Sequence, residues 1–351
     1  MNVLSVFDGM SCAQIALERT GFKVDNYFAS EIDKFAIKVT QSNYPETIQL
    51  GDITKIHGAD LPAIDLLVGG SPCQGFSYAG KGLNFNDPRS ALFFEFVRLL
   101  KEVKPKWFLL ENVKMGQKWQ DVISGFLGVE PIEINSALIS AQNRKRLYWT
   151  NIPNITQPKD KHIFWGDVRE RGVELSPIYY SERGLRWIGR HGERKGKQLR
   201  VHNDNEKMQM VEATHYKKYG SQRFFGIIDT PEKPAAIVGR KLNENKKRDD
   251  YNNDLKTVQC LEVSKSKKIR CLSTVRKDFV VSNLPIGRYP NVFQTLQEGK
   301  HYRYITPLEC ERLQTVPDNY TDSVSNTQRY KMLGNGFTVD VIAHILSNIN
   351  E

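Results

Sequence analysis

The first 150 residues alternate short apolar runs with helix-like segments, and this rhythm limits the fold more than any other feature of the chain. The apolar runs lie at 3–7, 24–30, 65–69, 106–113 and 132–138. Between them, 11–21 and 89–103 place apolar residues at every third or fourth position. A repeated strand–helix–strand unit predicts an α/β fold, doubly wound, with a mostly parallel sheet and helices on both faces. In such sheets, ligands bind outside the carboxyl ends of the strands.

From about residue 165 to 300 the rhythm gives way to sequence rich in Gly, Lys, Asn and Asp, which predicts a second, smaller, irregular and basic domain. Residues 181–300 hold 26 Lys/Arg and 14 Asp/Glu, a surplus of +12, so the other 231 residues carry −2 of the net charge of +10. Such asymmetry is typical of a chain that holds a polyanion with one lobe and a small molecule with the other. A lysine-rich surface that only confers solubility explains the composition equally well. The charged run 241–254 is interpreted as a mobile loop, with ordering on a partner as the alternative.

After this region the chain returns to helical patterns. Residues 306–314 predict a helix with Thr306 as N-cap, Pro307 at the first position and Glu309 completing a capping box. The apolar stretch 338–349 predicts a last helix that packs on the first domain.

Composition excludes several classes of protein. A chain of 351 residues is long enough for a full hydrophobic core without covalent staples. Its five cysteines form no CxxC pair, which argues against a disulfide framework or a zinc site and for a reducing compartment. No window approaches the roughly 18 apolar residues of a membrane span, and the N-terminus lacks a charged region before its apolar run. We therefore expect a soluble, cytoplasmic protein without a metal.

Three polar features follow predicted strands in the first half. FDGMS (7–11) is a tight turn in which Gly9 lets the backbone approach a ligand. Glu31 stands where an acid can hold ribose hydroxyls, and Asp52 can accept a hydrogen bond from an adenine amine. Each alone is explained as well by an ordinary turn or a solvated capping acid. Together they outline a nucleoside-containing cofactor, and because the chain has no GxxxxGK[ST] or GxGxxG loop to hold a pyrophosphate, S-adenosyl-L-methionine fits best.

The stretch GGSPCQGFS (69–77) places Cys73 in a glycine-rich turn directly after a buried strand. A thiol at the carboxyl edge of a sheet is nucleophilic when nearby cations or backbone amides lower its pKa. A lone cysteine is more commonly a small buried hydrophobe. Pro72 and Gly75 fix the flanking backbone in an open path, which favours a presented nucleophile.

Glu111 and two arginines are the other candidate catalytic residues. ENV (111–113) ends an apolar strand, so Glu111 reaches the same sheet edge, where a carboxyl can act as an acid toward a substrate nitrogen. In AQNRKRLYW, Arg144 and Arg146 are two apart and share one face of an extended segment, so they can clamp a phosphate or a base oxygen. A solvated basic edge is the alternative.

These motifs, in this order, resemble those of the S-adenosylmethionine-dependent DNA (cytosine-5) methyltransferases, most closely the phage and bacterial members. Nine stretches carry the resemblance: FDGMS, Glu31, Asp52, SPCQGFS, LFFEFVRLL, ENV, QNRKR, RLQTVPDNY (312–320) and LGNGFTVDVI (333–342). The chain departs from the family pattern at Ser11, where many members have a second glycine. It departs again at Gly336-Phe337, where a small-residue and proline run is common.

The resemblance implies a catalytic, cofactor-binding domain (1–165 with 325–351), a target-recognition domain (166–305) and a hinge segment (306–324). It casts Cys73 as the nucleophile that adds to carbon 6 of cytosine and Glu111 as the donor to N3. Arg144, with Arg146 as second choice, would hold the exocyclic oxygen or a phosphate. The implied cofactor residues are Phe7, Asp8, Gly9, Glu31, Ile32, Asp52, Ile53, Pro72, Leu92 and Asn335. The segment 74–88 resembles a loop that closes over a flipped base. The implied DNA contacts are Gln74, Ser77, Lys81, Arg89 and, in the variable region, Thr274, although an ordinary strand and turn explains the sequence around Thr274 equally well.

The expected function is methylation of carbon 5 of cytosine in a specific double-stranded DNA sequence, by base flipping and a covalent Cys73 adduct. The expected setting is a monomer near the nucleoid of a bacterial or phage-infected cell, with or without a cognate restriction endonuclease. An RNA-directed relative and a non-catalytic DNA-binding module on the same fold are the alternatives. The long basic region argues against the first, and the presence of Cys73, Glu111 and both arginines argues against the second.

Overall fold

The structure, a computed structural model, describes residues 1–71, 88–170 and 306–349, and the backbone of short strands between residues 199 and 290. For residues 88–90 it describes the backbone alone.

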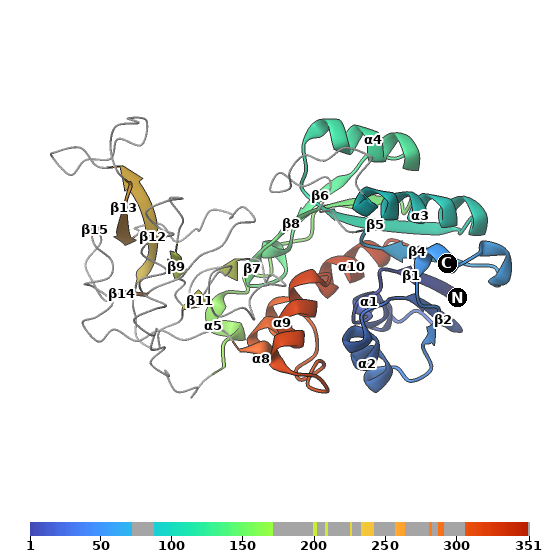
Figure 1. Cartoon of the computed structure of the whole chain (residues 1–351), viewed down its shortest axis with the longest axis horizontal. Helices are drawn as coiled ribbons and strands as arrows, with labels where there is room; N and C mark the ends of the chain where they lie inside the picture. Colours follow the sequence, from blue (N-terminus) through green and yellow to red (C-terminus); the bar gives the residue numbers. More distant parts are fainter. Residues whose placement is uncertain are drawn as a thin grey trace.

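A seven-stranded sheet forms the centre of the first domain, in the order β3-β2-β1-β4-β5-β8-β6 (Figure 1). Its strands are β1 (Asn2–Val6), β2 (Asn26–Ser30), β3 (Ile48–Gln49), β4 (Leu66–Gly69), β5 (Trp107–Val113), β6 (Ile132–Asn135) and β8 (Lys145–Thr150). The first five are parallel, and β8 runs antiparallel to both β5 and β6. The α/β fold with a mostly parallel sheet is therefore confirmed. The apolar run 132–138 stays a strand only to Asn135 and then turns as a short 3-10 helix, η3 (Ser136–Leu138).

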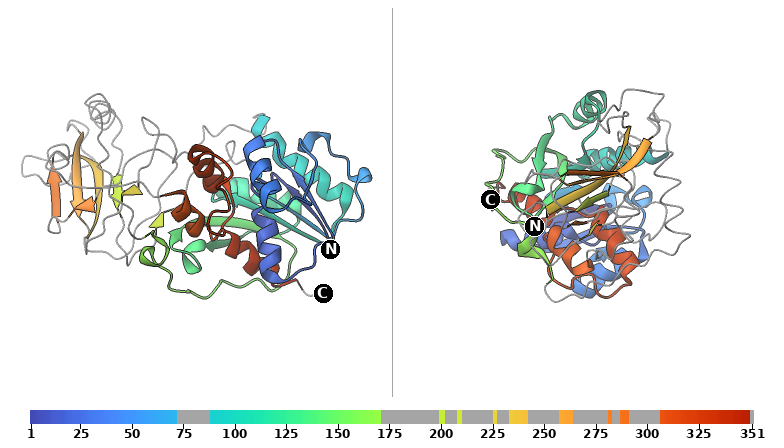
Figure 2. Two further views of the ribbon diagram at one scale, coloured as in Figure 1. Left: turned by 90° about the horizontal axis from the view of Figure 1, so that it is seen from below. Right: turned by 90° about the vertical axis from the view of Figure 1, so that its left-hand side faces the viewer.

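Helices cover both faces of this sheet. On one side lie α1 (Cys12–Thr20), α2 (Lys34–Asn43), α5 (Trp165–Val168), α8 (Pro307–Leu313), α9 (Asn326–Asn335) and α10 (Val339–Leu346). On the other side lie α3 (Pro88–Val103) and α4 (Gln117–Leu127). Figure 2 shows the red C-terminal helices beside the blue N-terminal ones.

The central strands read as unbroken apolar runs because they are buried on both faces. In β4, Leu66 and Val68 point into the core beneath α1 and α10, whereas Leu67 points into the core beneath α3. Full burial of each such side chain stabilises the fold by about 1.5–3 kcal/mol.

The C-terminal segment returns to the first domain, as the sequence predicts. The capping box of α8 is present: Thr306 Oγ1 accepts from the Glu309 N–H at 3.1 Å, and Glu309 Oε2 accepts from the Thr306 N–H at 2.7 Å. Helix α10 packs on α1, where Arg19 and Asp340 form an ion pair of 2.6 Å. The segment 306–324, expected as a hinge, contributes four side chains to the same core: Cys310, Leu313, Val316 and Tyr320.

The intervening region contains strands of a second sheet. These are β9 (Leu199–Val201), β11 (Phe225–Gly226), β12 (Lys233–Lys241), β13 (Thr257–Val263), β14 (Val281–Ser282) and β15 (Gly287–Pro290). They lie to one side of the seven-stranded sheet in Figure 1. A two-residue strand, β10 (Met208–Gln209), pairs with β7 (Gln142–Asn143) and joins this region to the first domain. That this region is a separate recognition domain stays a prediction. None of the helices described is long and apolar enough to cross a membrane.

Candidate active site

The polar residues singled out in the sequence meet at the carboxyl edge of the parallel strands. The turn 7–11 follows β1, Glu31 follows β2, Asp52 follows β3, and Gly70-Ser71 follows β4. The strand order reverses at β1, which pairs with β2 on one side and β4 on the other. Such a switch point is where open α/β sheets bind their ligands.

The turn after β1 has an unusual backbone. Phe7, Gly9 and Ser11 adopt φ values of 55°, 62° and 57°, all in the left-handed region. This conformation costs a residue with a side chain about 1–2 kcal/mol. A Cβ built on Gly9 meets no atom within 4 Å, so the backbone there faces open space that a ligand can enter.

Glu31 fastens this turn to the end of β2. Its Oε2 accepts from the Gly9 N–H at 2.8 Å, and its Oε1 accepts from the N–H groups of Ile32 and Asp33 at 2.7 and 2.8 Å. A carboxylate offers about four acceptor positions, so one remains for a hydroxyl of a ligand. Ile32 beside it is 77% exposed, which leaves an uncovered apolar side chain next to Glu31.

Asp8 points away from the cleft. Its carboxylate is buried and accepts hydrogen bonds from the Ser11 hydroxyl and, at 2.7 Å, from the Tyr27 hydroxyl. Burial raises the pKa of Asp8 to about 6, although the hydrogen bonds from Ser11, Ser5 and Tyr27 act in the opposite direction. A cofactor contact from Asp8 would therefore come from its backbone.

The segment after β3 is held from two sides. Asp52 Oδ1 accepts from the Thr54 N–H at 3.0 Å and caps η1 (Ile53–Lys55), and these hydrogen bonds lower the pKa of Asp52. Ile53 is only 4% exposed and its side chain belongs to the core, so it too would meet a cofactor through its backbone. Arg98 donates to the carbonyls of Ile53 and Ile56 at 3.0 and 2.9 Å, an anchor that sequence analysis missed.

Leu92 and Asn335, both predicted to border the cofactor, lie on two different helices. Leu92 of α3 is half-buried beside the core, and Asn335, the last residue of α9, is exposed.

Gly69 and Gly70 at the end of β4 have no side chain, so strand β1, the ring of Phe337 and Glu111 of β5 approach this end closely. A Cβ on Gly69 would lie 2.7 Å from Val6 Cγ2, which excludes a side chain there. A Cβ on Gly70 would lie 2.8 Å from Phe337 Cε1 and 3.5 Å from Glu111 Oε2. Phe337 thus packs where the β4 edge meets Glu111, a position that the sequence did not reveal.

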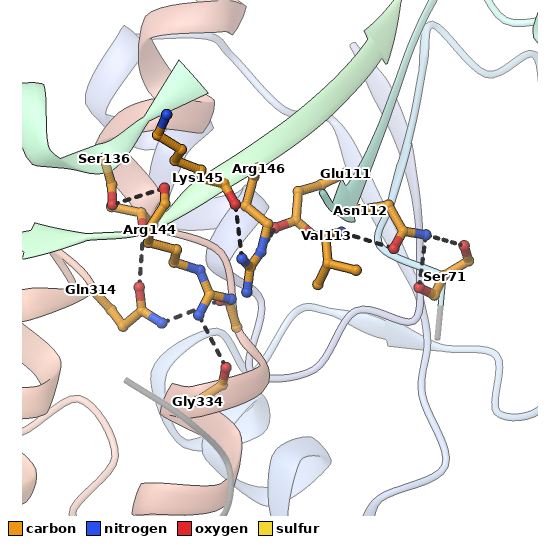
Figure 3. Close-up of polar contacts among 12 residues, drawn as sticks. Ser71, Glu111, Asn112, Val113, Ser136, Arg144, Lys145, Arg146, Gln314 and Gly334 are labelled. Atoms are coloured by element: carbon orange, nitrogen blue, oxygen red, sulfur yellow. Dashed lines mark hydrogen bonds and ion pairs between the residues drawn. The ribbon is translucent and has the colours of Figure 1, made fainter. Parts of the chain in front are cut away.

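Glu111 lies within β5 rather than after it, because the antiparallel strand β8 pairs with β5 as far as Val113. This register brings Arg146, opposite Val113, to Glu111: Arg146 Nε lies 3.0 Å from Glu111 Oε1, and both side chains are about nine-tenths buried (Figure 3). The contact is an ion pair rather than an aligned hydrogen bond. The next residue, Asn112, donates to the Ser71 carbonyl at 3.4 Å and hydroxyl at 3.2 Å, and so ties β5 to the chain just before Cys73.

Arg144 has different partners, although it lies beside Arg146. Its Nη1 donates to the Gly334 carbonyl at 3.2 Å and its Nη2 to the Gly336 carbonyl at 2.9 Å. Burial, followed by the charge of Arg146, lowers the pKa of Arg144 to about 10, so it remains charged at neutral pH. The sequence placed both arginines together, but it gave no means of separating their roles.

Several predicted site residues lie outside the described residues: Pro72, Cys73, Gln74, Ser77, Lys81 and Thr274, with the side chain of Arg89. Their roles stay predictions. Among the residues that are described, no three His, Cys, Asp or Glu side chains are grouped in a way that could hold a metal ion.

Comparison with known sequences finds one family and several methyltransferases that match this chain. A family described as "C-5 cytosine-specific DNA methylase" matches residues 1–121 and 139–351. Type II methyltransferase M1.ScrFI of Lactococcus lactis subsp. cremoris is 30% identical over 364 residues, which cover 99% of this chain and 78% of that protein. The orphan methyltransferase M.SPRI of Bacillus phage SPR is 26% identical over 432 residues, covering 99% of this chain and 97% of its own.

Solved structures share the fold across the whole chain. The methyltransferase EhMeth of Entamoeba histolytica superposes with a TM-score of 0.64 at 16% identity, covering 99% of this chain and 97% of its own. Dnmt2 of S. pombe gives a TM-score of 0.61, also at 16% identity, with coverage of 99% and 97%. The residues at the strand ends, which fit a nucleoside cofactor, agree with the sequence match. The chain therefore belongs to the C-5 cytosine-specific DNA methylase family, enzymes that use S-adenosylmethionine as the methyl donor.

Proposed function

We propose that this enzyme methylates carbon 5 of one cytosine within a specific double-stranded DNA sequence, after flipping that base out of the helix and adding Cys73 to it. The observation that carries the proposal is the Glu111–Arg146 ion pair of 3.0 Å, buried at the carboxyl edge of β5. Asn112 ties this edge to Ser71, two residues before Cys73 in the chain.

The chemistry explains the need for these groups. Carbon 5 of cytosine is a weak nucleophile, and addition of the Cys73 thiolate to carbon 6 makes the ring an enamine that reacts at carbon 5. Glu111, in its protonated form, donates to N3 during the addition, which offsets the negative charge that develops on the ring. S-adenosylmethionine supplies an electrophilic methyl group. Loss of the carbon 5 proton then allows the Cys73 sulfur to leave.

Arg146 is the arginine that we assign to the exocyclic oxygen of the base. Its ion pair with Glu111 places a cation beside the group that faces N3, and the exocyclic oxygen is the next acceptor on that ring. This reverses the order of preference expected from the sequence, in which Arg144 came first.

The cofactor residues divide by what their side chains can reach. Glu31 has acceptor capacity left for ribose hydroxyls, and exposed Ile32 can cover one face of adenine. We assign Phe7, Gly9, Asp52, Leu92 and Asn335 to the same cleft, with backbone contacts from Asp8 and Ile53 and with Pro72 at the entrance of the Cys73 turn.

The basic region 166–305 is the proposed DNA-recognition domain, with 1–165 and 325–351 as the catalytic domain. The surplus of +12 over residues 181–300 supports phosphate contacts, which would make affinity strongly salt-dependent. Gln74, Ser77, Lys81 and Arg89 would meet the DNA on closure of the loop, and Thr274 would face base edges. Base flipping costs a few kcal/mol, which these contacts offset. The enzyme would act as a monomer, alone or beside a cognate restriction endonuclease.

A duplex that carries 5-fluorocytosine at the target tests the mechanism, because fluorine at carbon 5 blocks the final elimination and traps the enzyme on DNA. Bisulfite sequencing of plasmid from expressing cells identifies the target first. We expect a covalent complex with wild-type protein and S-adenosylmethionine, and none with Cys73→Ser, whose affinity for the cofactor should be unchanged. Absence of a trapped complex with folded wild-type protein would exclude the Cys73 adduct. Transfer of tritiated methyl groups to transfer RNA but not to duplex DNA would favour the RNA-directed alternative.

A further inference from the structure

We propose that Arg144 is a positioning residue for the cofactor and not a contact to the base. It joins the base-binding strand to the turn Gly334–Phe337 and holds that turn in the shape that S-adenosylmethionine requires. The inference rests on the proposed function, which assigns Asn335 in this turn to the cofactor cleft.

The guanidinium of Arg144 holds the end of helix α9. The last four carbonyls of an α-helix have no partner within the helix, and a cation at this end is favoured by the helix dipole. Arg144 donates to the carbonyls of Gly334 and Gly336, at 3.2 and 2.9 Å, which stand directly before and after Asn335. The Gly334–Asn335 and Gly336–Phe337 peptide groups are therefore held by one side chain, and the exposed Asn335 lies between the two residues whose carbonyls accept.

Gln314 supports the same turn from a third stretch of chain. It is fully buried, and its Nε2 donates to the carbonyls of Leu333 at 2.5 Å and Gly336 at 3.3 Å. Its Oε1 accepts from Gln142 Nε2 at 2.7 Å and from the Thr338 hydroxyl at 3.0 Å. The Gly336 carbonyl thus receives donors from both Arg144 and Gln314 (Figure 3 shows both side chains beside Gly334).

Three sequence motifs are joined in this buried network: residues 142–144, 313–314 and 333–338. Buried polar groups that satisfy one another rigidify the segments they connect. If Arg144 were to hold a base oxygen instead, the buried Gly334 carbonyl would lose this donor and the Gly336 carbonyl would keep only Gln314, which is costly. Arg146, two residues along, lies against Glu111.

The matched variants Arg144→Lys and Arg146→Lys test the assignment, because both keep the charge and lose the fork of the guanidinium. The affinity for S-adenosylhomocysteine is measured by calorimetry without DNA, and methyl transfer is measured with varied cofactor at saturating DNA. For Arg144→Lys we expect the cofactor Kd and KM to rise about tenfold or more, because charged hydrogen bonds to the turn are lost, and kcat at saturating cofactor to stay within about threefold. For Arg146→Lys we expect Kd within about twofold of wild type and a fall in kcat of about a hundredfold.

The opposite pattern overturns the proposal: an unchanged cofactor Kd in Arg144→Lys with loss of 5-fluorocytosine trapping makes Arg144 a base contact. If Arg144→Lys weakens cofactor binding and DNA binding to the same extent and also lowers Tm, the role of Arg144 is merely structural, which also overturns the proposal. If Arg144→Lys does not fold, Gln314→Glu replaces it, since this variant removes the amide donor to Gly336 at similar size; its cofactor Kd should rise, and an unchanged Kd overturns the proposal. Wild-type protein that binds S-adenosylhomocysteine but transfers no methyl group contradicts the proposed function while leaving the Kd comparison intact.

Discussion

Gly70→Ala is the substitution whose consequence the structure defines most closely. The added methyl carbon would lie 2.8 Å from Cε1 and 3.3 Å from Cζ of Phe337. Carbon atoms in packed interiors ordinarily stay about 3.5–4.0 Å apart, so the ring must retreat by roughly 0.7–1.2 Å. Because Phe337 directly follows Gly336, whose carbonyl accepts from Arg144, we expect the retreat of the ring to displace this turn as well. A single methyl group at the end of β4 therefore disturbs both the base pocket and the cofactor turn.

Overpacking of this kind costs about 1–3 kcal/mol of folding free energy. Glu111 Oε2 would be 3.5 Å from the new methyl group, an ordinary contact, so the carboxylate itself need not move. We expect the free energy of unfolding of Gly70→Ala to fall by about 2 kcal/mol. We expect kcat to fall about tenfold, corresponding to about 1.4 kcal/mol of lost transition-state stabilisation.

A double-mutant cycle with Phe337→Leu provides the test, because the shorter side chain leaves room for the methyl group. Urea unfolding and initial rates of methyl transfer are measured for the two single variants and the double variant. Relief of the clash should appear as a coupling free energy of about 1 kcal/mol or more. Strict additivity of the unfolding free energies, or a Gly70→Ala enzyme equal to wild type, would refute the contact between Phe337 and the β4 edge.

Three further predictions concern other parts of the site. Glu31→Ala removes the acceptor that holds the Gly9 N–H and should raise the cofactor KM by about 30-fold, equivalent to about 2 kcal/mol; calorimetry with S-adenosylhomocysteine checks it, and an unchanged affinity contradicts the role. Burial raises the pKa of Asp8 from 3.8 to about 6, so the native state binds more protons than the unfolded state between these values and the free energy of unfolding falls as pH rises through this window. By urea unfolding, the stability of wild type relative to Asp8→Asn should fall by up to about 3 kcal/mol between pH 4 and pH 6.5, and a difference that stays constant would show that Asp8 titrates at its ordinary pKa. Asn112→Ala frees Ser71 from β5 and should lower kcat about tenfold with the cofactor affinity unchanged; equal kcat values would mean that this tie does not position the Cys73 turn.

Much of the site was visible in the sequence because its signals are local. A glycine that needs a positive φ, an acid at the end of an apolar run and a capping box each depend on a few neighbouring residues. Gly9, Glu31 and Thr306 were identified in this way: Gly9 adopts a positive φ, and Glu31 and Thr306 accept hydrogen bonds from backbone N–H groups. The reason for Gly70 was not visible, since the ring that excludes a side chain there comes from Phe337, far along the chain.

The roles of Asn112, Arg98 and Gln314 within their motifs were not visible for a similar reason. Their hydrogen-bond partners are backbone carbonyls or hydroxyls of distant segments, and such partners carry no signal in the side-chain sequence. Asp8 and Ile53 were assigned to the cofactor together with their neighbours, but their side chains turn inward. Periodicity in a short turn does not determine which of two adjacent side chains faces the cleft.

The sequence by itself did not predict β3, α2 and α4, but it determined the α/β class, most strands of the first domain, the family and the chemical groups that gather at the strand ends. These follow from periodicity, turn chemistry and motif order, all of which are properties of short stretches. Only the tertiary structure decided which arginine meets Glu111. That choice depends on the register of β8 against β5, which sets Arg146 opposite Val113. It also depends on the end of α9, because the Gly334 carbonyl that accepts from Arg144 is 190 positions away in the sequence. Residues two apart in sequence acquire separate tasks because different distant segments reach each of them.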